Sequence, residues 1–138
     1  MSELSMTRLF DAPVERVFDA WLNKSWGAWA GPPGFRGEVL TLEPKVGGRY
    51  RIAMFRPDGG SSVVGGVYRE IDRPRRLVMS WQWEGDPNDT LITLDFRAVG
   101  DKTQISLKHE GFATADGRDN HQSGWVATLD KLAAHLGG

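Results

Sequence analysis

A chain of 138 residues, 40% of them hydrophobic and 25% charged, suits one globular domain with a single core over residues 1–138. Its formal net charge of -1 gives no basic surface for nucleic acid or an anionic membrane, and the absence of cysteine excludes disulfides, thiolate nucleophiles and cysteine-ligated metals. The N-terminus has no signal-peptide pattern and no apolar run reaches membrane-spanning length, so we expect a soluble cytoplasmic protein.

The first part of the chain predicts one strand followed by helical structure. Residues 4–10 read as a strand, and the Asp-Ala-Pro sequence at 11–13 ends it with residues that favour the start of a helix. Apolar residues at helical spacing predict a helix over 14–23, and a second short turn over 25–29. The Gly-Pro-Pro-Gly sequence at 31–34 cannot continue a helix.

Six further strands follow at short intervals with turn residues between them. Apolar residues alternate with polar ones such as Ser80, Thr93 and Asp95, which predicts a sheet with one buried and one wet face. The glycine pair at 65–66 could hold a bulge, so the sequence leaves open whether Tyr68 and Glu70 face the interior. The predicted strands cover residues 36–43, 49–55, 63–71, 75–83, 90–98 and 103–110.

The last segment predicts a long amphipathic helix that covers the apolar side of the sheet. Asp116 is a suitable N-cap, apolar residues recur at helical spacing over roughly five turns, and Gly137 and Gly138 end the helix. The order of elements predicts an α+β helix-grip fold. In it, a curved antiparallel sheet of six to seven strands wraps around the C-terminal helix, and one or two short helices follow the first strand.

Several motifs in this order resemble one known family over essentially the whole chain. They are Ala12-Pro13 with Val17-Phe18-Asp19-Ala20-Trp21, Gly47-Gly48-Arg49-Tyr50, Gly66-Val67-Tyr68-Arg69-Glu70-Ile71, Arg76-Leu77-Val78, His121-Gln122-Ser123-Gly124-Trp125 and Leu129-Asp130-Lys131-Leu132. The chain resembles the family named for the C-terminal domain of the activator of the heat-shock protein 90 ATPase, within the START/SRPBCC superfamily. The resemblance implies a deep cavity between sheet and C-terminal helix, used across the superfamily for lipids, polyketides and hormones.

Large apolar and aromatic residues are the candidates for lining or plugging this cavity. For any single aromatic residue a plain core position is the more common role, so the prediction concerns the set. The candidate ligand-binding residues are Trp21, Trp29, Phe35, Tyr50, Ile52, Met54, Tyr68, Met79, Trp81, Trp83, Leu94, Phe96, His109, Phe112, His121 and Trp125.

Among the polar candidates His121 is the most informative, because it lies one turn before Trp125 on the same helical face. A capping or exposed histidine is the competing interpretation, and His109 suits a core position as well as a ligand contact. The histidines lack metal-ligand spacing, and neither a nucleophile elbow nor a phosphate-binding glycine loop is present, so no metal site, cofactor or catalytic residue is assigned. The arginines at 69, 73, 75 and 76 indicate a solvated turn or, alternatively, an anion site at the rim.

Three functional hypotheses follow. The first is binding of a small hydrophobic or aromatic molecule, of lipid or polyketide type, by a monomer or homodimer. The second is a cofactor-independent enzyme of cyclase or dehydratase type, with His121, His109, Tyr50 and Tyr68 as candidates for proton transfer. The third is a stress-related co-chaperone, which rests only on the family resemblance.

Overall fold

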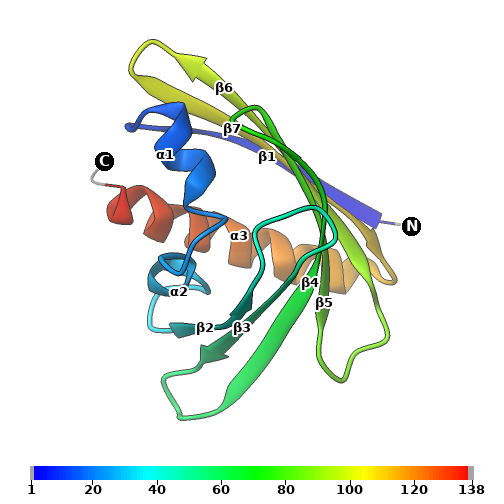
Figure 1. Ribbon diagram of the computed structural model, residues 1–138. Coiled ribbons are helices and arrows are strands. Elements are labelled where there is room, and N and C mark those ends of the chain that lie inside the picture. The colour runs from blue at the N-terminus through cyan, green and yellow to red at the C-terminus, as the bar shows by residue number, and fades with distance from the viewer. Residues whose placement is uncertain (1, 137–138) are drawn as a thin grey trace.

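One curved antiparallel sheet of seven strands wraps around a long C-terminal helix, and two short helices follow the first strand (Figure 1). The computed structural model describes residues 2–136. The strand order β1-β7-β6-β5-β4-β3-β2 makes the first and second strands the two edges, and the predicted helix-grip fold is confirmed. The elements are β1 (Ser2–Phe10), α1 (Val14–Asp19), α2 (Trp26–Trp29), β2 (Arg36–Leu42), β3 (Arg49–Phe55), β4 (Ser61–Asp72), β5 (Arg76–Trp83), β6 (Thr90–Val99), β7 (Lys102–Phe112) and α3 (Ala115–His135).

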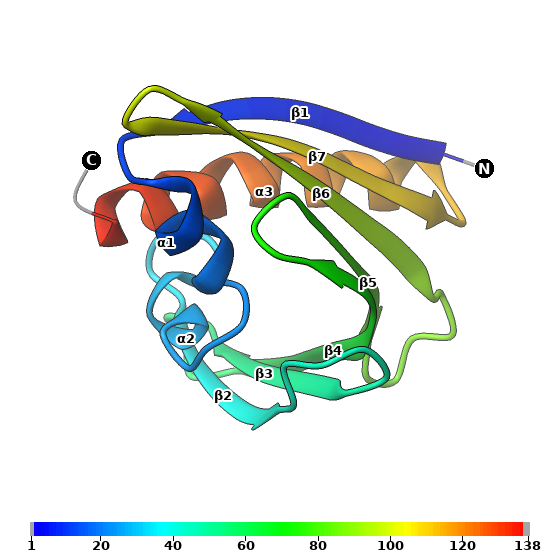
Figure 2. The ribbon, with the colours of Figure 1, turned by 45° about the horizontal axis from the view of Figure 1, so that its top comes forward.

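The sheet bends enough to enclose an interior. Figure 2 shows β1, β7 and β6 on one side and β2, β3 and β4 on the other, joined through β5. Helix α3 contacts β1 and β7, while α2 contacts both β2 and α3 near the open side of the curve. Alternation along β6 shows the one-sided burial, because Leu94 and Phe96 are buried whereas Asp95 and Arg97 are exposed.

Helix α1 is shorter than predicted, ending at Asp19 instead of residue 23. Beyond it the backbone tightens: the N–H of Trp21 donates to the carbonyl of Phe18 at 3.2 Å, and that of Leu22 donates to Asp19 at 2.9 Å. Bonds from residue i+3 to residue i belong to the tighter 3₁₀ type of turn. In this turn the Trp21 side chain is fully buried, with its ring 4.7 Å from that of Trp29.

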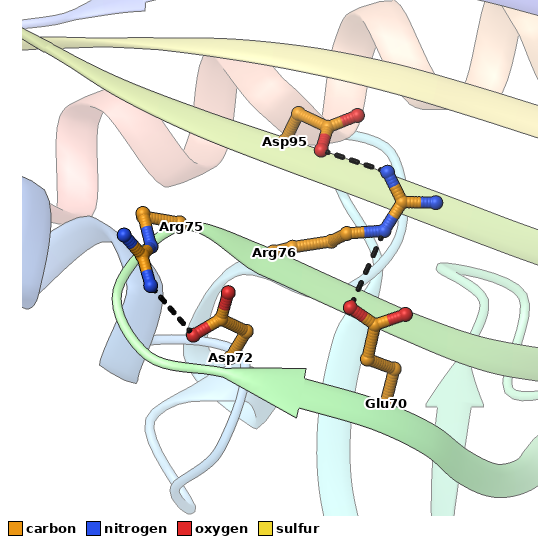
Figure 3. A network of polar contacts seen from close by, with 5 residues as sticks. All are labelled: Glu70, Asp72, Arg75, Arg76 and Asp95. Atoms are coloured by element: carbon orange, nitrogen blue, oxygen red, sulfur yellow. Dashed lines mark hydrogen bonds and ion pairs between the residues drawn. The ribbon is translucent and has the colours of Figure 1, made fainter.

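Strand β4 contains a bulge, but not at the glycine pair. The same pairing offset joins Val64 to Trp83 and Tyr68 to Met79, and the register shifts only between Tyr68 and Glu70. Tyr68 is therefore buried, and Glu70 lies on the outer face. There Glu70 pairs with Arg76, which also reaches Asp95 of β6, as Figure 3 shows.

The alternation predicted that Ser80 lies on the wet face of the sheet. This prediction is wrong, because β4 covers the residue. Its side chain is 6% exposed, and its Oγ accepts a hydrogen bond from the N–H of Val67 at 2.8 Å. A Cβ on Gly66 would lie 2.0 Å from the Ser80 carbonyl oxygen. Only glycine fits this close approach of the two strands.

The N-cap of helix α3 lies two residues earlier than the sequence predicted. The N-cap is Thr114, whose Oγ1 accepts from the N–H of Gly117 at 3.0 Å, and Asp116 lies in the first turn, where its charge is favourable to the helix dipole. The helix runs to His135; the predicted stop at Gly137 and Gly138 lies outside the described residues.

Candidate functional site

A pocket of about 260 Å³ opens between helix α3, the 30–35 loop and the sheet. Helix α3 supplies one wall from positions 120, 121, 124, 125 and 128, whose spacing places them along one helical face. The inner wall is buried, whereas Trp83, Asn120 and His121 are more exposed and mark the mouth. The lining residues are Trp26, Ala30, Gly31, Pro32, Phe35, Met54, Trp81, Trp83, Asn120, His121, Gly124, Trp125 and Thr128.

The 30–35 loop forms the wall opposite α3 and is tied to that helix by one ammonium group. Lys131 Nζ donates to the carbonyl of Ala30 at 3.0 Å and to that of Phe35 at 3.1 Å. Burial lowers the pKa of Lys131. The loop turns through Gly31 at φ +77° and Gly34 at φ +91°, a conformation that favours glycine. Lys131 therefore holds together both ends of the loop that lines the pocket.

At the mouth, Trp83 and His121 form a directed hydrogen bond. The indole N–H of Trp83 donates to His121 Nε2 at 3.0 Å, and an indole nitrogen can only donate. Nε2 is therefore the unprotonated acceptor, and the ring proton sits on Nδ1, which donates to the Gly117 carbonyl at 2.8 Å. Both imidazole nitrogens are thus occupied, and this geometry requires a neutral ring.

A second indole–imidazole pair lies deeper. Trp125 Nε1 donates to His109 Nδ1 at 3.0 Å, so the His109 proton is on Nε2 and points to Thr90 Oγ1 at 2.6 Å. The Thr90 hydroxyl in turn donates to the carbonyl of Trp81. Burial lowers the pKa of His109 to about 3. His109 is therefore a neutral, fully bonded group inside the core.

The two candidate tyrosines are also bonded inside the protein. Tyr50 donates its hydroxyl to the carbonyl of Ser80, and Tyr68 donates to that of Trp21 at 3.0 Å. Burial raises the pKa of Tyr50 well above its usual value, with a smaller contribution from Tyr68, and burial also raises the pKa of Tyr68. Both phenols stay protonated and act as donors to the backbone.

The arginine cluster is neutralised by carboxylates at three of its four positions. Arg75 reaches Asp72 at 3.3 Å and Arg76 reaches Asp95 at 3.2 Å (Figure 3). Arg73 donates two hydrogen bonds to the Asp19 carboxylate, both at 2.9 Å, which lower the pKa of Asp19. These contacts are those of a surface ion-pair network on exposed side chains, which contributes little to stability.

The structure divides the sixteen predicted ligand-binding residues into two groups. Six line the pocket: Phe35, Met54, Trp81, Trp83, His121 and Trp125. The other ten are buried in the core away from the pocket lining: Trp21, Trp29, Tyr50, Ile52, Tyr68, Met79, Leu94, Phe96, His109 and Phe112.

Sequence reasoning missed several small or polar lining residues and one large one. Gly124 lies three residues after His121 and Thr128 lies three residues after Trp125, so helical spacing from those two candidates predicts both. Trp26 lies five residues after Trp21 in helix α2. This helix is too short to show a periodicity from which a buried face could be predicted. The missed residues are Trp26, Ala30, Gly31, Pro32, Asn120, Gly124 and Thr128.

Three indole N–H groups, those of Trp21, Trp29 and Trp81, are buried without a hydrogen-bond acceptor among residues 2–136. Their rings make edge contacts instead: Trp21 meets Trp29 at an interplanar angle of 73°, and Trp81 meets Trp83 at 88°. In such contacts the positive ring edge faces a π cloud, which offsets part of the cost of burial.

The described part of the chain, residues 2–136, contains no cluster of three or more histidine, aspartate or glutamate side chains placed to hold a metal ion. Over the same residues no helix is both long and apolar enough to cross a bilayer.

The fold is shared with several solved structures from bacteria. A Chromobacterium violaceum protein is 28% identical with a TM-score of 0.91, over 97% of this chain and 96% of that one. The AHSA1 protein of Silicibacter pomeroyi is 23% identical with a TM-score of 0.85, over 99% and 98% of the two chains. CalU16 of Micromonospora echinospora is 24% identical with a TM-score of 0.72, over 97% and 75%.

No curated protein matches this chain. The family described as activator of Hsp90 ATPase homolog 1-like protein matches residues 11–137, which is nearly the whole sequence and contains every pocket residue. The chain therefore belongs to the activator of Hsp90 ATPase homolog 1-like family.

Proposed function

We propose that this protein binds a small hydrophobic or aromatic molecule in the pocket between the sheet and helix α3. The observation that carries the proposal is the pocket itself, in which four tryptophans, Trp26, Trp81, Trp83 and Trp125, surround unfilled space. Ligand sites are typically concave, mostly apolar and equipped with a few polar groups, and His121, Asn120 and Thr128 supply those groups here.

The size of the pocket favours a small ligand. Its volume of about 260 Å³ lies just below the range of roughly 300–1,000 Å³ for small-molecule sites. One or two rings fit such a space, whereas a long acyl chain would extend out of the mouth. Such a ligand can enter from solvent at the mouth, where Trp83, Asn120 and His121 are more exposed than the inner wall.

The polar groups support binding rather than turnover. The groups that the cyclase or dehydratase hypothesis needs for proton transfer are His109, His121, Tyr50 and Tyr68, and each already makes a hydrogen bond within the protein. A general acid or base must have its proton or lone pair directed at the substrate. Only His121 lines the pocket, and both of its nitrogens are occupied.

We also propose that the protein acts in the cytoplasm as a monomer or homodimer, without nucleic acid or membrane. Light scattering coupled to size-exclusion chromatography measures the oligomeric state.

The test is a thermal-shift and tryptophan-fluorescence screen against polyketides, flavonoids, fatty acids and small aromatic compounds, because a ligand that binds the folded state raises its melting temperature. The blocking variant is Gly124→Phe, since a Cβ at Gly124 meets no heavy atom within 4 Å and the residue lines the pocket. Val126→Phe places the same ring on the exposed side of α3 as a matched control. We expect saturable shifts that Gly124→Phe removes and Val126→Phe keeps. No response from any compound class would contradict the proposal.

A further inference from the structure

We propose that the ligand is an uncharged planar aromatic molecule and that the pocket discriminates against anions such as fatty acids and aromatic carboxylates. This inference rests on the proposed binding function and specifies the chemical class that the site takes.

The pocket wall carries no charge. Its lining contains no aspartate, glutamate, lysine or arginine, and the only titratable lining residue is His121. The imidazole accepts from Trp83 at 3.0 Å and bonds the Gly117 carbonyl at 2.8 Å, an arrangement that needs the neutral ring. A protonated His121 would place two donors face to face at Nε2. The mouth of the pocket therefore offers no free imidazole N–H to an acidic ligand.

Three cations on elements that border the pocket already have hydrogen-bond or ion-pair partners. Lys131 donates to the carbonyls of Ala30 and Phe35, and Arg118, on the first turns of α3, pairs with Asp119 at 2.9 Å. At the Trp83 end of β5, Arg51 holds Glu84 at 2.7 Å. A carboxylate inside the pocket would lose its hydration without gaining a partner, which is a costly transfer.

The shape of the wall favours flat aromatic rings. Trp81 and Trp125 lie 5.2 Å apart, centroid to centroid, at an interplanar angle of 48°, and Trp83 stands at 88° to Trp81. These rings offer faces and edges for stacked and edge-on contacts. The Met54 side chain adds a polarizable sulfur. Gly124 leaves open space next to Trp125 because it has no side chain.

A single neutral polar group on the ligand has partners. Asn120 and Thr128 both line the pocket, and an amide and a hydroxyl can each donate and accept hydrogen bonds. A phenol or an alcohol can bond to either of these side chains without burying a charge. The expected ligand is therefore a molecule with one aromatic ring, or two fused rings, that carries one hydroxyl or carbonyl group.

The test compares 2-naphthol with 2-naphthoate, which share the ring system and differ in charge at about pH 7. Tryptophan fluorescence titration of the wild-type protein gives both dissociation constants, and Gly124→Phe and Val126→Phe report whether binding is in the pocket. We expect 2-naphthol to bind at least about tenfold more tightly than 2-naphthoate. Binding should be lost in Gly124→Phe and kept in Val126→Phe. If Gly124→Phe does not fold cooperatively, Gly124→Leu replaces it.

Equal or tighter binding of 2-naphthoate, abolished by Gly124→Phe, would overturn this inference while leaving the proposed binding function intact. A loss of naphthoate affinity in Lys131→Met would then identify Lys131 as the anion partner. If neither compound binds in the pocket, and the wider screen is also negative, the proposed function itself fails.

Discussion

Two regions of the interior are built from the same residue types and differ in what fills them. In the packed region Trp21, Trp29, Tyr50 and Tyr68 are all fully buried, and their ring centroids approach to 4.7 Å between the tryptophans and 5.5 Å between the tyrosines. In the pocket region Trp81 contacts both Trp83 and Trp125, but all three residues also border unfilled space. Aromatic content alone therefore does not distinguish a core from a binding wall.

The difference between the regions lies in small residues and in the loop that closes the space. Ala30, Gly31 and Gly124 border the pocket with little or no side chain. Trp26 stands at the boundary, because its ring stacks on Trp29 at 5.7 Å and on Tyr50 at 5.0 Å while the residue also lines the pocket. In this protein, glycine and alanine residues therefore mark where the packed core gives way to the pocket. The predictions below test this difference between the two regions.

The largest expected effect comes from truncating a tryptophan of the packed region. Trp21→Ala should lower the free energy of unfolding by roughly 3–5 kcal/mol, because it removes a fully buried ring and leaves a cavity. Trp83→Ala should cost clearly less, since Trp83 is only partly buried at the mouth. Urea denaturation of both variants measures the two losses. Equal losses would break the distinction between core and wall.

The second effect is a loss of stability in mild acid caused by His109. Its pKa is depressed from 6.5 to about 3 in the folded protein, so the unfolded chain binds a proton first as the pH falls. The stabilisation is complete above about pH 6.5 and is lost on acidification toward pH 3, by up to about 1.4 kcal/mol per pH unit.

The matched control for this effect is His109→Asn, which removes the titrating group. The variant should be less stable at neutral pH, because it changes the bonds to Trp125 and Thr90, but its stability should fall less steeply between pH 6.5 and 3. Denaturation at a series of pH values gives both slopes. Parallel slopes in the two proteins would show that His109 titrates normally.

The third effect concerns the loop that closes the pocket. Lys131→Met removes two hydrogen bonds from a partly buried ammonium to the carbonyls of Ala30 and Phe35. The expected cost is about 1.5–3 kcal/mol, the usual range for hydrogen bonds to charged groups. Hydrogen exchange should speed up in the 30–35 loop and not in β6. Unchanged exchange in that loop would mean that the ammonium does not hold it.

The smallest effect should come from Gly124→Ala. The added methyl group meets no heavy atom within 4 Å, and alanine has the higher helix propensity, so we expect a gain of up to about 1 kcal/mol. Gly66→Ala is the contrasting variant, because its Cβ would lie 2.0 Å from a backbone oxygen and should destabilise the sheet. Thermal unfolding of both variants checks the signs. A loss of stability in Gly124→Ala would show that the space beside α3 is not open.

The sequence predicted the fold because periodicity and turn residues act locally. The alternation of apolar residues in β6 and their helical spacing in α3 predicted which faces are buried. Phe96 and Leu129 are examples. Element ends were less predictable: the tight turn after Asp19 and the Thr114 cap depend on how these segments pack against the rest of the protein.

The candidate site was only partly predictable for the same reason. Large residues such as Trp81 and Trp125 stand out in the sequence, but whether they face a pocket depends on what lies opposite them. The open space beside Gly124 and the hydrogen bond from Trp83 to His121 both depend on segments that are far apart in the sequence. Composition and spacing carry no signal for such contacts. The bulge between Tyr68 and Glu70 likewise became visible only from the strand pairing.

The most direct test of the account is nuclear magnetic resonance of the six tryptophan indole N–H groups during titration with 2-naphthol, with assignments from single Trp→Phe variants. The account predicts saturable shifts for the four pocket tryptophans, Trp26, Trp81, Trp83 and Trp125, and much smaller shifts for Trp21 and Trp29 in the packed region. No shifts, or uniform shifts of all six signals, would contradict a binding pocket at this place in the fold.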